Sequence, residues 1–214
     1  MKHWPLKTLL MLPLLILMGC AQSPVVTKDA AALRLEMVQH IVNFEARRDR
    51  SGKIIVYRLP RGDGGGKYEV AGINDRYHPK AARALRRLVE AGKAEEAEAQ
   101  AVLYIAGKTD FPANHANTNA IRFLLRDIAW NRGPTGAVRT LQIALGVPMD
   151  GKIGPVTLRA LEQAEQDPET LIAAIRAARE KYERRTRDET SIMWDGLVNR
   201  WTKAGDRAKT YLAK

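Results

Sequence analysis

Residues 43–79 read NFEARRDRSGKIIVYRLPRGDGGGKYEVAGINDRYHP. Glu45 closes an apolar helical pattern that starts at Asp29, a residue suited to a helix N-cap. The β-branched run of residues 54–57 and a glycine-rich segment at residues 62–74 follow, which predicts a small β region directly after the helix. Strand signals are nearly absent outside residues 53–73, so we predict a mainly α protein of the α+β type.

The remainder of the chain shows helical periodicity. Residues 120–132 carry apolar side chains at i, i+3, i+4, i+7 and i+8 and should form the buried central helix, which Gly133-Pro134 should end. Residues 107–119 should form a loop, because Gly107 should stop the preceding helix and turn-forming residues cluster after it. Further helices are expected at residues 79–92, 93–106, 135–146, 156–166 and 168–187, and in a terminal segment with Trp194 and Trp201.

The N-terminus has the pattern of an export signal. Lys2 and Lys7 form a short positive segment before an apolar run at residues 8–18 that is too short to span a bilayer comfortably. The run ends in Leu17-Met18-Gly19-Cys20, which resembles the lipobox of bacterial lipoproteins, and Cys20 is the one cysteine of the chain. We expect a signal peptide at residues 1–19, a lipid anchor on Cys20 and a tether at residues 20–28; an ordinary secretory signal is the alternative.

The net charge of the chain favours a polyanionic partner. The formal charge is +11, and it falls to +9 when residues 1–19 are removed, because they contain two lysines and no acidic residue. Cell-wall polymer and anionic lipid head groups suit an exported protein better than nucleic acid does. The residue after Cys20 is Ala21 rather than the Asp that retains lipoproteins in the inner membrane, so resemblance to such lipoproteins implies the outer membrane, facing the periplasm.

Several motifs together resemble a known family. They are Phe44-Glu45, Gly64-Gly65-Gly66, Gly72-Ile73-Asn74, Asp127, Asn131-Arg132-Gly133, Leu141-Gln142, the segment DGKIGPVTL at residues 150–158, and WDGLVNR at residues 194–200. In this combination, residues 37–201 resemble glycoside hydrolase family 108, the secretion-lysozyme group, with its C-terminal peptidoglycan-binding region. The resemblance implies a lysozyme-like helical region at residues 29–133 and a helical peptidoglycan-binding-like region at residues 134–214.

The resemblance implies that Glu45 donates a proton to a glycosidic bond. Glycoside cleavage needs such a protonated carboxyl group, which a partly apolar site beside Phe44 would favour, and either a second carboxylate or an attacking group on the substrate. Asp63, held among flexible glycines, is the first choice for the second carboxylate, with Glu69 and Asp75 as competitors. Without one, the muramic acid 6-hydroxyl could attack, as in lytic transglycosylases. The alternative role for Glu45 is a surface ion pair with Arg48 at i+3.

Other polar and aromatic residues are candidates for contact with sugars. Tyr68, Asn74 and Tyr77 could stack on or hydrogen-bond to sugar rings. Asp127 and Asn131 share one side of the central helix and could support the cleft floor, or serve as a cap or buried polar link. The four histidines lack metal-ligand spacing, so we expect no metal and no cofactor.

These observations predict a lipid-anchored enzyme that cleaves the glycan strands of peptidoglycan. The glycine-rich segment is not a phosphate-binding loop, because Arg61 stands where the first glycine is required and Tyr68 where Ser or Thr is required. Glu45 is followed by Ala46-Arg47-Arg48, where the family normally has Gly-Gly-Tyr. A lipid-anchored wall-binding protein without catalysis is therefore the main alternative, and a basic interaction protein is a third possibility.

Overall fold

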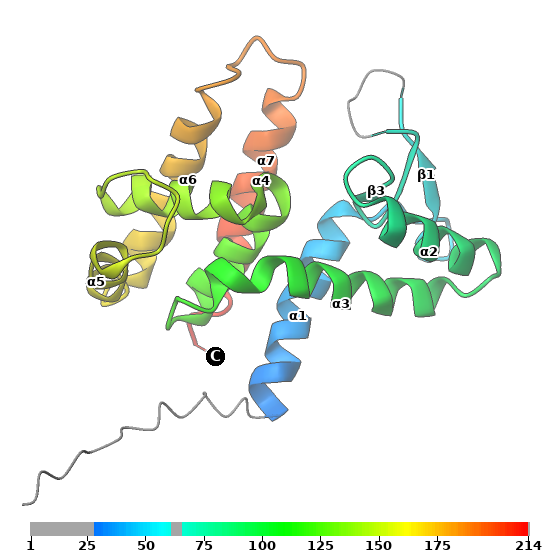
Figure 1. Cartoon of the computed structure of the whole chain (residues 1–214), viewed down its shortest axis with the longest axis horizontal. Helices are drawn as coiled ribbons and strands as arrows, with labels where there is room; N and C mark the ends of the chain where they lie inside the picture. The colour runs from blue at the N-terminus through cyan, green and yellow to red at the C-terminus, as the bar shows by residue number, and fades with distance from the viewer. Residues whose placement is uncertain (1–27, 61–65, 214) are drawn as a thin grey trace, which may run out of the picture.

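The structure is a computed structural model that describes residues 28–60 and 66–213. It contains seven α-helices and a three-stranded sheet in this part of the chain (Figure 1), which confirms the prediction of a mainly α protein. The elements are, in order, α1 Lys28–Glu45, β1 Val56–Arg58, β2 Tyr68–Val70, β3 Ile73–Asn74, α2 Pro79–Glu90, α3 Ala94–Ala113, α4 Asn119–Leu145, α5 Pro155–Ala164, α6 Pro168–Glu183 and α7 Trp194–Lys209.

Helix α4 is the centre of the molecule. It packs most extensively against α3 and α6 and also contacts α1, α5 and α7. Its predicted apolar stripe is buried, which confirms the prediction of a buried central helix (Ile121, Leu124, Leu125, Ile128). The predicted break at Gly133-Pro134 is a kink inside α4, where Gly133 has φ 72° and ψ 164°. The expected boundary between the two regions of the chain therefore falls within one kinked helix.

Helix α3 corrects the sequence-based prediction for residues 107–119. The helix continues through Gly107 and Pro112 to Ala113, so most of this segment is helical rather than a loop. Glycine costs only about 1 kcal/mol in a helix, and tertiary contacts readily outweigh that amount. The contacts here come from Asp110, which forms ion pairs with Arg34 of α1 and Arg126 of α4, each at 2.7 Å.

The sheet is a small antiparallel meander in the order β1-β2-β3, as the β-branched and glycine-rich segments predict. Val56 pairs with Val70, and Val70 also pairs with Ile73 across a two-residue turn. The turn residues Ala71 and Gly72 have φ values of 52° and 75°, the pattern of a type I′ hairpin. The sheet joins the helical core through buried side chains (Ile54, Val70, Ile73).

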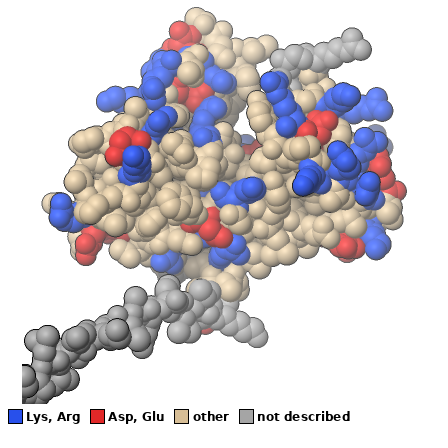
Figure 2. All heavy atoms as spheres, viewed as in Figure 1, with Lys and Arg blue, Asp and Glu red and all other residues tan. Residues whose placement is uncertain are grey.

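Helices α6 and α7 form the C-terminal side of the molecule. Asp167 caps α6, because its side chain accepts a hydrogen bond of 3.1 Å from the backbone N–H of Thr170. The helix ends at Glu183 rather than near the predicted residue 187. Figure 1 shows α7 leading back from the α6–α7 connection beside α4. Figure 2 shows a hollow between this side and the β region, with lysine and arginine side chains on both rims.

In the part of the chain that the structure describes, no helix is both long and apolar enough to cross a membrane. The predicted signal peptide and Cys20 lie outside the described residues.

Candidate active site

Glu45 lies where α1 meets the β region. It is the last residue of α1, and its side chain is 23% exposed. The chain then turns through an isolated bridge between Arg48 and Ile54 and enters β1. The apolar stripe of α1 ends just before this acid, since Ile41 and Val42 are fully buried about one turn earlier.

The β2–β3 turn packs directly against Glu45. A Cβ atom added to Gly72 would lie 2.7 Å from Cβ, 3.0 Å from Cγ and 3.2 Å from Oε2 of Glu45. Gly72 therefore satisfies two demands, the positive φ of the turn and the close approach of the acid. Ala71 before it adopts φ 52°, which is uncommon for a residue with a Cβ. The turn thus fixes one side of the Glu45 side chain.

Arg200 of α7 holds the other side of Glu45. Its Nη1 lies 2.8 Å from Glu45 Oε1, in a close ion pair without the alignment of a good hydrogen bond. The guanidinium also lies over the Phe44 ring, 4.6 Å from the ring centroid. Arg48, the predicted alternative partner of Glu45, instead pairs with Glu98 at 2.6 Å. Nothing in the local sequence around Glu45 indicates a partner so distant along the chain.

The same arginine binds Asp127, which is fully buried. Arg200 Nη2 and Nε lie 2.6 Å and 3.1 Å from Asp127 Oδ1, and Arg179 Nη1 lies 2.7 Å from Oδ2. Burial opposes ionisation of Asp127, but the two guanidinium groups outweigh it and keep its pKa below the ordinary value. Asn131 donates a 2.7 Å hydrogen bond to the Asp127 carbonyl oxygen. Asp127 thus fixes Arg200 and has no surface on which to touch a sugar.

The pKa of Glu45 is raised, in contrast to that of Asp127. Burial is the largest cause, because it penalises the charged carboxylate. Arg200 acts in the opposite direction, and the negative charge of Asp127 raises the pKa further. The site therefore contains two neighbouring carboxyl groups whose pKa values are shifted in opposite directions, raised for Glu45 and lowered for Asp127. Neighbouring carboxyl groups whose pKa values are shifted in opposite directions are typical of acid–base sites.

The other sequence-based candidates lie around the sheet. Tyr68 in β2 is half-buried, with Arg86 5.0 Å from its ring centroid. Asn74 Oδ1 accepts a 2.9 Å hydrogen bond from the N–H of Tyr77, whose side chain is 65% exposed. Of these three candidates, Tyr77 has the most surface free to meet a ligand.

The predicted second carboxylates are only partly described. Asp63 lies outside the described residues, as do Gly64 and Gly65. Asp75 accepts hydrogen bonds from the backbone N–H groups of Lys67 and Tyr68, at 2.7 Å and 3.3 Å. The first of these bonds is the main cause of its lowered pKa. Asp75 Oδ1 therefore holds the end of the glycine-rich segment in place.

An aromatic cluster near the site has no clear signal in the sequence. His78 stacks on Trp130, with ring centroids 5.2 Å apart and an interplanar angle of 14°. Its Nδ1 lies 3.0 Å from the Tyr104 hydroxyl. Burial is the main cause of the lowered pKa of His78, and Lys108 adds to it. This rigid group links the start of α2 to α3 and α4.

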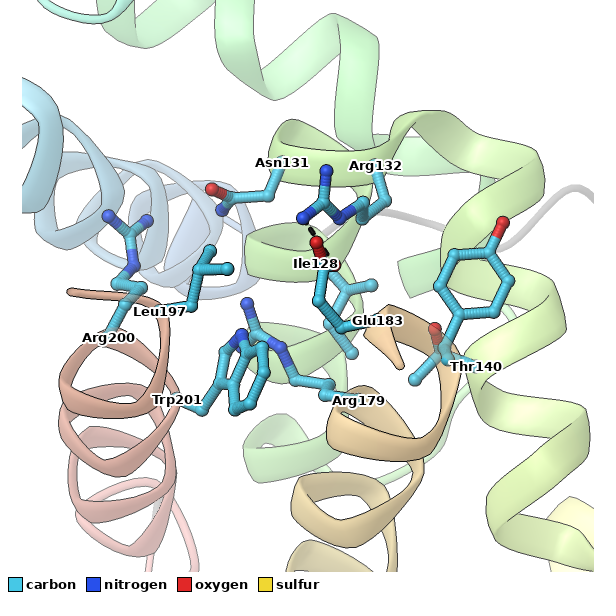
Figure 3. A pocket seen from close by; sticks show the side chains of 10 residues that line it. Ile128, Asn131, Arg132, Thr140, Arg179, Glu183, Leu197, Arg200 and Trp201 are labelled. Atoms are coloured by element: carbon cyan, nitrogen blue, oxygen red, sulfur yellow. Dashed lines mark ion pairs between the residues drawn. The ribbon is translucent and has the colours of Figure 1, made fainter. Parts of the chain in front are cut away.

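A small cavity of about 20 Å³ lies beside Arg200, between α4, α6 and α7 (Figure 3). Figure 3 shows Glu183 of α6 meeting Arg132 of α4 there, while Arg200 extends from α7 toward α1. A space of this size accommodates about one water molecule if polar partners surround it. The cavity therefore continues the charged network behind the candidate acid. Within residues 28–60 and 66–213, no three His, Cys, Asp or Glu residues come together to hold a metal ion.

Comparisons with known proteins agree with a peptidoglycan-associated chain. Residues 136–202 match the family model described as "Predicted Peptidoglycan domain". The fold is similar to that of SagA from Brucella abortus, with a TM-score of 0.61 and 19% sequence identity over 86% of this chain and 98% of that one. At this identity the likeness shows a shared fold. No curated protein matches the chain in sequence.

Proposed function

We propose that this protein is a glycosidase that cleaves the glycan strands of peptidoglycan, with Glu45 as the proton donor. The observation that carries the proposal is the raised pKa of a mostly buried Glu45 at the junction of α1 and the β region. The hollow beside the β region, with cationic rims, suits an anionic polymer (Figure 2). The match of residues 136–202 supports peptidoglycan as the partner.

The residues of the site suggest how the bond is broken. Glu45 donates its proton to the bridging oxygen while the bond from that oxygen to the anomeric carbon breaks. Arg200 then stabilises the carboxylate that remains on Glu45, since its Nη1 is already 2.8 Å from Oε1. Asp127 holds Arg200 in place, and the turn at Gly72 packs closely against the Glu45 side chain.

Two routes complete the reaction. In hydrolysis, Asp63 would activate a water that attacks the anomeric carbon, leaving a reducing end. In the single-acid route, the 6-hydroxyl of muramic acid attacks and its proton returns to Glu45, leaving an anhydro ring. Asp127 cannot serve as the second carboxylate of the hydrolytic route, because this neighbour of Glu45 is fully buried and engaged by two arginines.

Activity against purified peptidoglycan tests the proposal. The chain from residue 21 onward keeps every described contact and should clear wall material in a zymogram, while Glu45→Gln should not. Glu95→Gln is the matched control, because Glu95 is exposed on α3. Mass analysis of the released muropeptides distinguishes reducing from anhydro ends. Equal clearing by wild type and Glu45→Gln would contradict the role of Glu45.

The Arg200–Glu45 ion pair gives weight to a second candidate, a wall-binding protein without catalysis. An arginine this close partly offsets the effect of burial on the acid. This candidate predicts sedimentation with peptidoglycan by both wild type and Glu45→Gln, with no soluble product from either. In both cases we propose that a lipid on Cys20 anchors the protein in the outer membrane, facing the periplasm.

A further inference from the structure

A groove at the start of α1 contains a cluster of arginines that the proposed reaction does not use. We call it the N-terminal groove, and it is lined by Ala30, Ala31, Leu33, Arg34, Met37, Asp110, Asn114, Asn119, Arg122 and Arg126. Its lining comes from α1, the end of α3 and the start of α4. Leu33 is twelve residues before Glu45 in the same helix, so the groove lies about 18 Å along α1 from the candidate acid.

The groove carries more positive than negative side chains. Arg34 and Arg126 both bind Asp110 at 2.7 Å. Arg122 adds a third guanidinium, which donates hydrogen bonds to the Ala116 carbonyl and to Asn119 but forms no ion pair with a carboxylate of the described residues. Three guanidinium groups against one carboxylate leave two positive charges. Burial, followed by the repulsion of Arg34 and Arg122, lowers the pKa of Arg126 despite the attraction of Asp110.

Arg126 also has an unused hydrogen-bond donor. Its side chain is 3% exposed, and its Nε is buried without a partner, while Nη1 binds Asp110 and Thr109. A buried donor without an acceptor costs about 1–3 kcal/mol. An oxyanion in the groove would supply both the acceptor and the missing negative charge, and a guanidinium suits a phosphate oxygen well.

The apolar residues of the groove indicate what kind of anion it could bind. Ala30, Leu33 and Met37 give one wall an apolar surface beside the arginines. A ligand that fits must therefore combine an anionic group with apolar parts, as a phospholipid does. The groove lies at the end of α1 where the chain continues toward Cys20, and Figure 1 shows the β region at the opposite end of α1.

We propose that the N-terminal groove binds the phosphate group of an anionic membrane phospholipid, with the arginines on the phosphate and the apolar wall against the glycerol and upper acyl chain. This contact would orient the protein with the start of α1 at the membrane and the Glu45 end directed away from it. It is independent of whether Glu45 is catalytic, because none of the lining residues belongs to the candidate active site.

Vesicle binding by the chain from residue 21 onward tests this proposal, since that chain lacks the apolar leader and Cys20. It should sediment with vesicles that contain phosphatidylglycerol and not with phosphatidylcholine alone. Arg122→Gln should weaken binding about fivefold, the effect of one basic residue at a membrane surface. Arg159→Gln is the matched control, because it removes the same charge from an exposed position on α5.

Each outcome decides the proposal. A loss with Arg122→Gln but not with Arg159→Gln, and with wall clearing unchanged in both, supports the phospholipid site. Equal losses in the two variants would show attraction by net charge alone and overturn it. If inorganic phosphate raises the melting temperature but the protein binds no vesicles, the groove binds free phosphate and not a lipid. If soluble muropeptides with free carboxylates compete for the groove, the lipid proposal is also wrong. Failure of Glu45→Gln to abolish clearing would leave this result unaffected.

Discussion

Arg200 Nη1 lies 2.8 Å from Glu45 Oε1, so a residue of the last helix faces the carboxyl group at the end of the first. The guanidinium favours the charged form of Glu45, whereas burial favours the neutral form, and burial is the larger effect. The proton affinity of the acid is therefore set by two parts of the chain that are far apart in sequence. This balance is the basis of the first prediction.

Replacing Arg200 should move the pH dependence of activity. The general acid must be protonated, so kcat/KM falls as pH rises through the pKa of Glu45. Arg200→Gln removes the charge that lowers this pKa, so the fall should occur at higher pH than in the wild type. Arg200→Lys keeps a positive charge and should shift the pH of this fall less. A lower rate with an unchanged pH profile would show that Arg200 acts only on stability.

Substitution of Gly72 should affect the acid more than the fold. In Gly72→Ala the new Cβ would lie 2.7 Å from Glu45 Cβ, which forces the side chain or the turn to move. The left-handed backbone adds a cost of about 1–2 kcal/mol. Gly92→Ala is the control, because Gly92 has a similar φ of 77° with no atom near its added Cβ. Both variants should lower the melting temperature, but only Gly72→Ala should lose most of the activity. Equal activity of the two variants would contradict the close packing of Gly72 against Glu45.

Removing the Asp127 carboxylate should strongly destabilise the protein. Asp127→Asn leaves the buried Arg179 without its anion, a change that costs about 3–5 kcal/mol of unfolding free energy, measurable by urea denaturation. Asp206→Asn, at an exposed position of α7, should change stability by less than about 0.5 kcal/mol.

The pH dependence of this effect has a definite sign. The pKa of Asp127 is lowered in the folded state, where two arginines outweigh burial, so its contribution is complete above the unfolded pKa of about 3.9. The contribution is lost as pH falls through the folded pKa. The difference between wild type and Asp127→Asn should therefore shrink in strong acid, and a constant difference would contradict the assignment.

Gln142 should stabilise the loop that carries the DGKIGP motif. Its buried amide donates to Asp150 Oδ1 at 2.7 Å and to the Lys152 carbonyl at 2.9 Å, and it accepts from the Gly151 N–H at 2.8 Å. Gln142→Leu should cost about 1–3 kcal/mol, because these loop groups lose their partner. Exposed Gln163→Leu is the control. If Gln142→Leu abolishes peptidoglycan binding while the protein stays folded, the loop contacts the wall itself rather than serving only the fold.

Local patterns were sufficient to predict the helices, the small β region and the position of Glu45. The apolar stripe of residues 121–129 predicted the buried centre of α4, because this signal acts within a few residues. Gly133-Pro134 predicted a helix end at the position where the structure has a kink inside α4. Residues 107–113 were predicted wrongly as loop, because Asp110 joins two arginines from other helices and outweighs the local effect of Gly107.

The environment of the acid could not be predicted in the same way. Arg200 and Arg179 occupy helical positions that resemble any solvent-exposed basic residue, and only the packing of α6 and α7 on α4 makes them partners of Asp127. The stack of His78 on Trp130 likewise depends on where the start of α2 meets α4. Such long-range contacts leave no periodic trace in the sequence.

The ion pair that spans the first and last helices has a consequence for biosynthesis. A chain emerging from the ribosome presents Glu45 early and Arg200 only near its end. Until α7 is made and folded, the carboxyl group lacks its cation and Asp127 lacks one of its two arginines. Under the proposed function, the acid chemistry at Glu45 would thus become available only after the final helix has folded against α1 and α4.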